Sequence, residues 1–313
     1  MSKVLVTSRS FGQVSQEPVR YLEEHGFQVS YYNHEYEEEV FIEHLTGCEG
    51  LIVGAHPVTE RVFLKTSGLR CVVKHGAGLD NIDLEAAKRN NVLIDNVPST
   101  NSDAVADLTM GLIIDVARKI SGSDRKVREG LWEKAIGVDA YAKTLSLIGF
   151  GTIGRKVAKR ARGFSMRILT YDPYLKEIPE EYGDYVALTD FGEAIAAADF
   201  LSLHLPLTSE TRNLVGNNEM AMMKQGSFLI NTSRGGIVNE KALVRALDQG
   251  QLRGVSLDVL EEEPLPVNHP LRGRENVIIT SHIGMYSEEA INAVSLQAAQ
   301  KLVTALKPWE DRR

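Results

Sequence analysis

The chain has 313 residues, of which 43% are hydrophobic and 25% charged, and a formal net charge of −7. This composition is typical of a globular protein, and the length predicts two domains. The negative charge argues against nucleic acid or an anionic membrane as a partner. The sequence has neither a signal peptide at its start nor an apolar run long enough to span a membrane, so we expect a cytoplasmic protein. Cys48 and Cys71 lack metal-ligand spacing, and no metal site is predicted.

Strands and helices alternate along the first 97 residues. The predicted strands are 3–7, 28–32, 50–53, 70–74 and 92–97, and the predicted helices between them are 16–25, 37–45, 59–65 and 83–89. Asp83 is expected to cap the last of these helices. This alternation predicts a parallel α/β sheet with a core of its own.

A glycine-rich stretch, His75 to Asp83, follows one of these strands. Gly76 and Gly78 flank Ala77, and their backbone N–H groups could hold a small carboxylate at the carboxyl end of the sheet. A turn that only caps the strand would explain the same residues equally well.

Turn-forming residues from Pro98 to Asp103 mark the first domain boundary. A long helix is predicted over 103–128, followed by an irregular arm over 129–142 that contains Trp132. Such a helix with a loose arm could pack against a second subunit or cover the edge of a sheet.

The stretch from Lys143 to Asp172 predicts a dinucleotide-binding unit. A buried strand over 144–148 leads into Gly149-Phe150-Gly151-Thr152-Ile153-Gly154, a helix over 154–161, a strand over 167–171 and then Asp172. Gly149 permits the tight turn, Gly151 leaves room for the pyrophosphate, and Gly154 lets helix and strand approach closely. The start of the helix offers N–H groups and a positive dipole to the phosphates.

Asp172 stands at about the spacing from the glycines that is expected of a ribose-binding acid. A carboxylate accepts hydrogen bonds from ribose hydroxyls and repels a 2′-phosphate, and no arginine follows it directly. The sequence therefore favours NAD over NADP.

Polar residues also follow the later strands of this half. Arg234, Asp258, Glu263 and His282 come after the predicted strands 228–231, 254–257 and 277–280. Because the carboxyl ends of parallel strands lie along one edge of a sheet, we expect these four side chains to meet near the bound dinucleotide.

In this order, these stretches resemble the D-isomer-specific 2-hydroxyacid dehydrogenase family over nearly the whole chain. The resemblance implies an α/β fold of two doubly wound, flavodoxin- and Rossmann-like domains with the active site in the cleft between them. Residues 1–97 with 287–313 would form the substrate-binding domain, and 98–286 the NAD-binding domain. It also implies that the helix over 287–306 returns to the first domain, and that the chain is a homodimer through the long helix and arm.

The resemblance gives the candidate residues their roles. Arg234 would hold the substrate carboxylate and polarise the keto oxygen, His282 would be the general acid and base, and Glu263 would keep a proton available on that imidazole. Ala77 and Gly78 would bind the carboxylate, and Asp258 would orient the nicotinamide amide. Cofactor contacts are assigned to Gly149, Gly151, Thr152, Ile153, Gly154, Asp172, His204, Pro206, Thr211, Thr232, Asp258 and Gly284.

The sequence departs from the family pattern near the substrate pocket. Ser281 stands where proline usually precedes the histidine, Met285-Tyr286 replaces small residues, and His56 stands where phosphoglycerate dehydrogenases tend to carry arginine. 3-Phosphoglycerate is the leading candidate substrate, beside hydroxypyruvate, glyoxylate and other small 2-keto acids.

Two other functions in the same family are weighed against this one. A formate dehydrogenase is disfavoured because that group has glutamine where Glu263 stands. An NAD-binding corepressor of the C-terminal-binding protein type would retain the same arginine, glutamate and histidine. The absence of extra interaction tails favours an enzyme.

Overall fold

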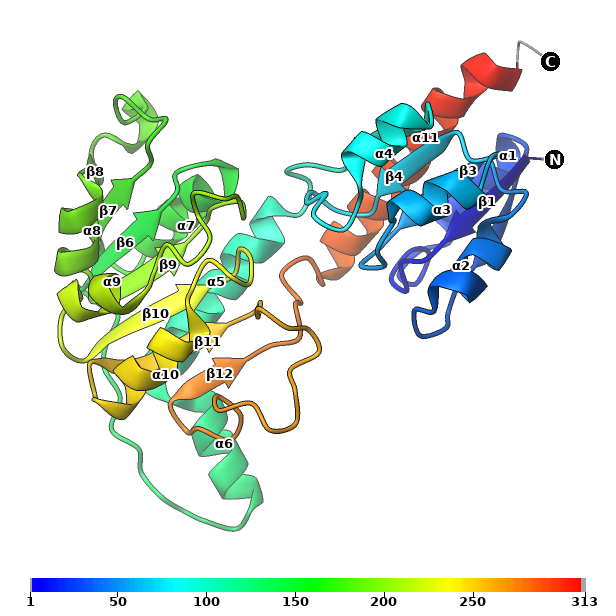
Figure 1. Ribbon diagram of the computed structural model, residues 1–313. Coiled ribbons are helices and arrows are strands. Elements are labelled where there is room, and N and C mark those ends of the chain that lie inside the picture. The colour runs from blue at the N-terminus through cyan, green and yellow to red at the C-terminus, as the bar shows by residue number, and fades with distance from the viewer. Residues whose placement is uncertain (1, 311–313) are drawn as a thin grey trace. The chain divides into compact units, whose positions relative to one another are not determined.

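The computed structural model describes residues 2–310, which divide into two compact α/β units (Figure 1). The first unit contains the residues up to Asn101 together with those from Met285 onward, and the second contains Ser102–Gly284. The sequence analysis placed these boundaries at 97/98 and 286/287. No helix within residues 2–310 is long and apolar enough to cross a membrane.

The first unit is built on five parallel strands in the order β2-β1-β3-β4-β5. The strands are β1 (Ser2–Val6), β2 (Phe27–Tyr31), β3 (Gly50–Val53), β4 (Cys71–Lys74) and β5 (Leu93–Asn96). The helices between them are α1 (Glu17–Glu24), α2 (Glu38–Leu45), α3 (Glu60–Lys65) and α4 (Leu84–Arg89). The predicted alternation is confirmed, and Asp83 caps α4 by accepting a hydrogen bond from Ala86 N at 2.8 Å.

The last helix, α11 (Glu288–Glu310), belongs to the core of this first unit. Its buried face, which includes Val294, Ala298 and Leu302, packs with residues of β1, β3 and β4. The approach is close, because a Cβ placed on Gly50 in β3 would lie 3.0 Å from the side chain of Leu302. One side of the first sheet is therefore covered by residues from the far end of the chain.

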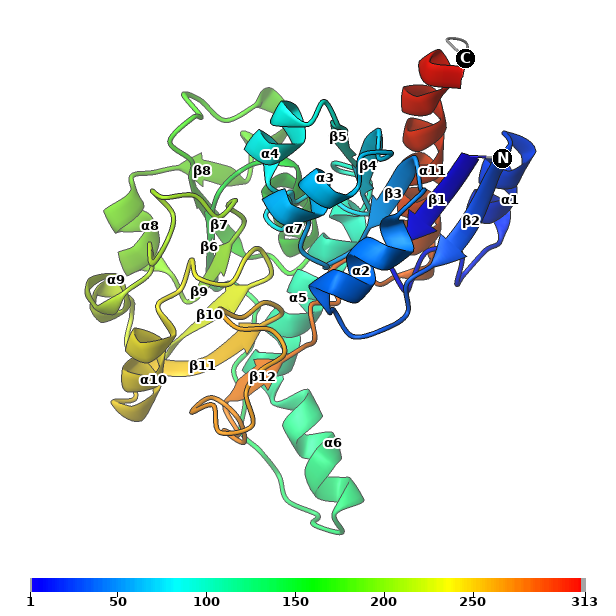
Figure 2. The same cartoon turned by 45° about the vertical axis from the view of Figure 1, so that its right-hand side comes forward.

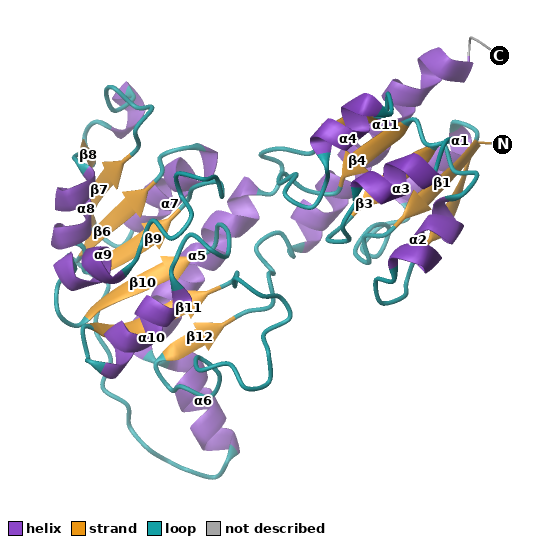
Figure 3. Cartoon of the chain, viewed as in Figure 1, coloured by secondary structure: helices purple, strands orange, loops and turns teal. Residues whose placement is uncertain are grey.

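The second unit has seven parallel strands in the order β12-β11-β10-β9-β6-β7-β8 (Figure 3). The strands are β6 (Thr144–Ile148), β7 (Arg167–Tyr171), β8 (Val186–Leu188), β9 (Phe200–Leu203), β10 (Ser227–Asn231), β11 (Leu252–Leu257) and β12 (Val277–Ile279). From β6 the strand order runs outward in both directions, which is the doubly wound arrangement of dinucleotide-binding folds.

Helices cover both faces of this sheet (Figures 1 and 2). One core contains residues of α5 (Ser102–Arg118) and α7 (Thr152–Arg162), and the other contains residues of α8 (Phe191–Ala197), α9 (Asn217–Met222) and α10 (Glu240–Asp248). A sheet buried on both faces explains why its strands read as continuous apolar runs. The 3₁₀ turn η1 (Glu180–Tyr182) precedes β8.

The single long helix predicted over 103–128 is wrong, because the chain breaks it into α5 and α6 (Ile120–Arg128). Lys119 between them is left-handed, with φ at 55°, so the helical hydrogen bonds cannot continue through it. Ser121 N donates to Asp115 Oδ1 at 2.8 Å instead. Burial also ends at this point, since α5 packs into the core whereas α6 has no buried residue. The predicted irregular arm over 129–142 is confirmed.

A buried histidine ties the first unit together. His75, which follows β4, makes hydrogen bonds through Nδ1 to Ser8 Oγ at 3.0 Å and through Nε2 to Ser295 Oγ of α11 at 2.9 Å. Burial, with a smaller effect from the Lys74 charge, lowers the pKa of His75 from 6.5 to about 4. The neutral imidazole therefore links the loops after β1 and β4 to the last helix.

We expect the first unit to lose stability as the pH falls from about 6.5 towards 4. The folded pKa of His75 is below the unfolded value, so the unfolded chain binds more protons in this window. The free energy of unfolding should fall by about 3 kcal/mol, since a pKa difference of one unit corresponds to about 1.4 kcal/mol. Urea unfolding between pH 7 and 4 measures it. His75→Gln should be less stable at pH 7 but less dependent on pH, and an equal pH dependence in both proteins would contradict this account.

Candidate functional site

The candidate site is built at the carboxyl edge of the seven-stranded sheet. All strand pairs in it are parallel, so the loops that follow β6, β9, β10, β11 and β12 lie along one edge. The strand order reverses between β6 and β9, and ligands of open α/β sheets bind at such a point.

The glycine turn after β6 is as tight as the sequence predicted. Gly149 has φ at +99°, and a Cβ there would lie 2.5 Å from the His204 carbonyl oxygen. A Cβ on Gly154 would lie 2.3 Å from the Gly149 carbonyl oxygen. Gly151, in contrast, is exposed and a Cβ on it would meet no atom within 4 Å. The backbone around Gly151 is therefore open to a ligand.

Helix α7 begins in this turn, with Gly151 as its N-cap and Thr152 and Ile153 as its first residues, two residues earlier than predicted. Asp172, at the end of β7, lies beside the turn because its Oδ2 accepts a hydrogen bond from Phe150 N at 2.9 Å. Its Oδ1 accepts one from Tyr174 N at 3.0 Å. An open glycine backbone, the first turn of a helix and an acid on the next strand together fit a dinucleotide.

The loop after β9 lies against this turn. His204 Nε2 and Ser202 Oγ are 3.0 Å apart, and burial lowers the pKa of His204 to about 4, so its ring is neutral near pH 7. Further along the loop, Thr211 Oγ1 donates to the Pro206 carbonyl at 2.6 Å. These bonds give the loop a fixed shape. The cofactor contacts expected of His204, Pro206 and Thr211 stay predictions.

The loop that carries Arg234 is closed by the buried amide of Asn231, a role that the sequence analysis missed. Asn231 Oδ1 accepts hydrogen bonds from Ser233 N at 3.1 Å and Ser233 Oγ at 2.8 Å, and its Nδ2 donates to the Arg234 carbonyl at 2.8 Å. Thr232 Oγ1 lies 2.9 Å from Thr109 Oγ1 of α5. The sequence signal for the role of Asn231 was a polar residue at the end of an otherwise apolar strand.

The next residue, Gly235, brings this loop against the one that follows β11. A Cβ on Gly235 would lie 1.8 Å from the Leu260 carbonyl oxygen, so no other residue fits without moving a backbone. Leu260 N in turn donates to Glu263 Oε1 at 3.0 Å. The loops of Arg234 and Glu263 are thus in direct contact.

Asp258 holds the turn on which His282 stands. Its carboxylate is buried and accepts hydrogen bonds from Thr280 Oγ1 at 2.6 Å, Ile283 N at 2.8 Å and Gly284 N at 2.9 Å. Its carbonyl accepts one from His282 N at 2.9 Å. The bond from Thr280 was not anticipated from the sequence, and the predicted contact of Asp258 with the nicotinamide amide stays a prediction.

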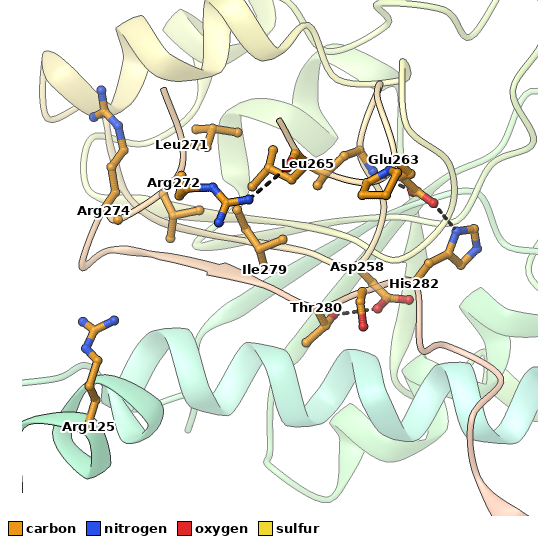
Figure 4. Close-up of a pocket in the computed structure, with 15 residues that line it drawn as sticks. Arg125, Asp258, Glu263, Leu265, Leu271, Arg272, Arg274, Ile279, Thr280 and His282 are labelled. Atoms are coloured by element: carbon orange, nitrogen blue, oxygen red, sulfur yellow. Dashed lines mark hydrogen bonds and ion pairs between the residues drawn. The ribbon is translucent and has the colours of Figure 1, made fainter. Parts of the chain in front are cut away.

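His282 and Glu263 form a hydrogen-bonded pair at 2.9 Å between Nδ1 and Oε2 (Figure 4). Burial raises the pKa of Glu263, but the hydrogen bonds from His282 and Leu260 N and the charges of His282 and Arg234 outweigh it and lower that pKa below its ordinary value. Glu263 is therefore a carboxylate near neutral pH. Both side chains line a cavity of about 620 Å³ whose other walls include Leu265, Leu271 and Ile279.

The four predicted side chains of this unit are thus connected. Glu263 contacts His282, Asp258 holds the turn of His282, and the charge of Arg234 acts on Glu263. Ala77 and Gly78, the predicted carboxylate-binding residues, lie in the first unit in the loop after β4, where Asn96 Nδ2 donates to the Ala77 carbonyl at 2.6 Å.

Known proteins resemble the chain in sequence and in structure. It is 38% identical over 311 residues to D-3-phosphoglycerate dehydrogenase of Methanocaldococcus jannaschii, covering 98% of this chain and 58% of the relative. It is 38% identical over 275 residues to glyoxylate reductase of Korarchaeum cryptofilum, covering 85% and 82%. A crystal structure of a Thermus thermophilus protein superposes with a TM-score of 0.89 at 33% identity, covering 98% and 97%.

The chain spans 40–58% of the length of the phosphoglycerate dehydrogenases it matches. Residues 110–284, which include the glycine turn and all four connected side chains, match the model of the NAD-binding domain of D-isomer specific 2-hydroxyacid dehydrogenases. With this match and the site geometry together, the chain belongs to the D-isomer specific 2-hydroxyacid dehydrogenase family, whose cofactor is NAD.

Proposed function

We propose that the protein is an NAD-dependent D-2-hydroxyacid dehydrogenase, which interconverts a small 2-hydroxy acid and its 2-keto acid. The observation that carries the proposal is the 2.9 Å bond between His282 and Glu263, beside the loop of Arg234. A hydrogen-bonded histidine and carboxylate next to an arginine can move a proton while holding a carboxylate substrate. NAD, held by the turn from Gly149 to Gly154 and by Asp172, supplies hydride transfer when bound.

Arg234, His282 and Glu263 have different tasks in the proposed reaction. The Arg234 guanidinium binds the substrate carboxylate through two parallel hydrogen bonds and polarises the keto oxygen. During reduction, C2 accepts the hydride and its oxygen accepts a proton from His282. In the reverse direction His282 takes that proton. Glu263, which stays ionised, orients the imidazole through its hydrogen bond to Nδ1. The backbone N–H groups of Ala77 and Gly78 supply further donors for the carboxylate.

Among substrates, 3-phosphoglycerate is our leading candidate, because relatives named for it match nearly the whole chain at 35–38% identity. Hydroxypyruvate and glyoxylate are the alternatives, since proteins named glyoxylate reductase match at 37–38%. A cytoplasmic location also remains a prediction from the sequence.

Turnover of a 2-keto acid tests the proposed reaction. NADH oxidation, followed by absorbance with a panel of keto acids, should proceed with at least one of them. His282→Ala should lower kcat by a factor of at least 100, because proton transfer by a positioned side chain contributes about 10²–10⁴. NADH affinity, measured by fluorescence, should stay within about threefold.

The matched control is His25→Ala, which removes a histidine that bonds Tyr21 O in the first unit and should leave turnover unchanged. A large loss of NADH binding in His282→Ala would contradict its assigned role. Tight NADH binding by the wild type, with no turnover of any keto acid, would instead support the corepressor alternative.

Asp172 should set the preference between the two nicotinamide cofactors. Its carboxylate is fixed beside the glycine turn by Phe150 N and would face the ribose hydroxyls. Asp172→Ala should weaken NADH binding about tenfold or more and change NADPH binding little, which titration calorimetry measures. An unchanged ratio of the two affinities would refute the ribose assignment.

We also propose that the protein is a homodimer through α6 and the arm over 129–142. In this segment Trp132 is 86% exposed and Ile136 82%, and α6 has no buried residue. The segment therefore presents an exposed apolar surface of the kind that marks protein–protein contacts. Exposed aromatic side chains of this kind dominate the binding energy of interfaces. A second copy of the chain is the partner that the family resemblance implies.

Sedimentation equilibrium of the full chain should give twice the mass of one chain. Trp132→Glu should weaken self-association at least about tenfold, because it replaces a large exposed apolar side chain of this segment with a charge. Tyr174→Glu is the control, since Tyr174 is 94% exposed outside this segment. A monomeric wild type, or equal effects of both variants, would disprove the dimer through the arm.

A further inference from the structure

The first unit has a switch point of its own at the carboxyl edge of its sheet. In the order β2-β1-β3-β4-β5 the strand order reverses between β1 and β3. The loops after these two strands, residues 7–16 and 54–59, therefore flank the place where ligands of open α/β sheets bind. The loop with Ala77 and Gly78 follows β4, which is the next strand along the same edge.

These loops are tied to one another. Gly54 N donates to Thr7 Oγ1 at 3.1 Å, and a Cβ on Gly54 would lie 3.1 Å from Ser8 Cα. Asn81 Nδ2 donates to the carbonyls of Gly54 at 3.1 Å and His56 at 2.6 Å. The three loops thus form one fixed rim at the edge of the sheet.

Arg9 stands on this rim with an exposed side chain and an anchored backbone. Its neighbours Ser8 and Ser10 are buried and lie 3.2 Å apart through their hydroxyl oxygens. Phe11 is also buried, and its N–H donates to the Ser8 carbonyl at 3.1 Å. Because the flanking residues are fixed, the backbone of Arg9 has a defined position in the loop beside the switch point, and its side chain carries a permanent positive charge.

His56 lies on the opposite loop and is held by aromatic contacts. Its ring stacks on that of Tyr36 with centroids 5.8 Å apart, and meets the edge of Tyr32 at 5.4 Å. Within the described residues its Nδ1 is buried without a hydrogen-bond partner. Burial lowers the pKa of His56, and the nearby charges of Arg9 and Lys74 lower it further, so the three groups share a region of positive potential.

We propose that Arg9, assisted by His56, binds a second anionic group on the substrate, at the end distant from its 2-carboxylate. The proposal rests on the proposed function, in which Ala77 and Gly78 on the same rim hold the 2-carboxylate. A phosphate and a second carboxylate share the chemistry that Arg9 recognises. On this account the protein takes a doubly anionic 2-keto acid and discriminates against glyoxylate and hydroxypyruvate.

Three keto acids that differ at the distal end test the proposal. Hydroxypyruvate has a neutral hydroxyl there, its 3-phosphate a phosphate, and oxaloacetate a carboxylate. The wild type should show the highest kcat/KM with one of the two doubly anionic acids, and which of them it is identifies the group. Arg9→Met should lower that value about 10- to 100-fold, as expected for a hydrogen bond between charged groups, and lower kcat/KM for hydroxypyruvate less than about threefold.

Further variants separate charge recognition from structure. Arg9→Lys should recover part of the loss, and His56→Phe, which keeps the aromatic stacking, should reduce kcat/KM for the anionic acid by a smaller factor than Arg9→Met. Arg20→Met removes an exposed arginine of α1 and should change nothing. Thermal unfolding of each variant shows whether the first unit is folded, and inorganic phosphate should inhibit the wild type more strongly than Arg9→Met.

Two results would overturn the proposal while the proposed function stands: a wild type that prefers hydroxypyruvate or glyoxylate, or an Arg9→Met variant that affects the anionic and neutral acids equally. Failure of the wild type to reduce any keto acid would overturn the proposed function itself, and the role of Arg9 with it.

Discussion

A buried carboxylate, that of Asp258, fixes the turn that presents His282. A polar group away from water is stable only when it has hydrogen-bond partners, and the partners of this carboxylate are two backbone N–H groups and one hydroxyl of residues 280–284. Satisfying them constrains the turn so strongly that His282 takes a left-handed backbone, with φ at 55°. The imidazole then meets Glu263 at 2.9 Å. Asp258 therefore sets the position of His282 through the backbone of the turn.

The other half of the site is positioned by neutral polar groups and by a glycine, which has no side chain to keep two loops apart. The Asn231 amide closes the loop of Arg234 with three hydrogen bonds, and Gly235 allows that loop to touch the backbone at Leu260. His204, which lies against the glycine turn, is also neutral because burial lowers its pKa. The groups that position this half of the site are therefore neutral.

Much of this could be predicted from the sequence, because the glycine turn and the strand ends depend on local patterns. Gly149, Gly154 and Asp172 occupy the places that their spacing indicated, and Glu263 meets His282 as parallel strands require. The break at Lys119 could not be predicted, since it depends on where burial stops rather than on any breaker residue. Short elements such as β8 and α9 carry too few residues for a periodic pattern.

Arg9 illustrates a second limit of sequence reading. The sequence around Arg9 does not distinguish it from an ordinary surface arginine. Arg9 becomes a candidate for binding only when the strand order shows that the loops after β1 and β3 lie side by side. Strand order is a property of the whole sheet, so a residue whose role depends on it is found from the fold.

The return of α11 to the first unit has a consequence for how the protein is made. The second unit is continuous in sequence, so it can close its core as soon as its own residues have left the ribosome. The first unit is translated earlier but lacks Leu302 and its neighbours until the final helix emerges. One apolar face of its sheet therefore stays uncovered until α11 has been synthesised after the second unit, so the first unit completes its core later than the second.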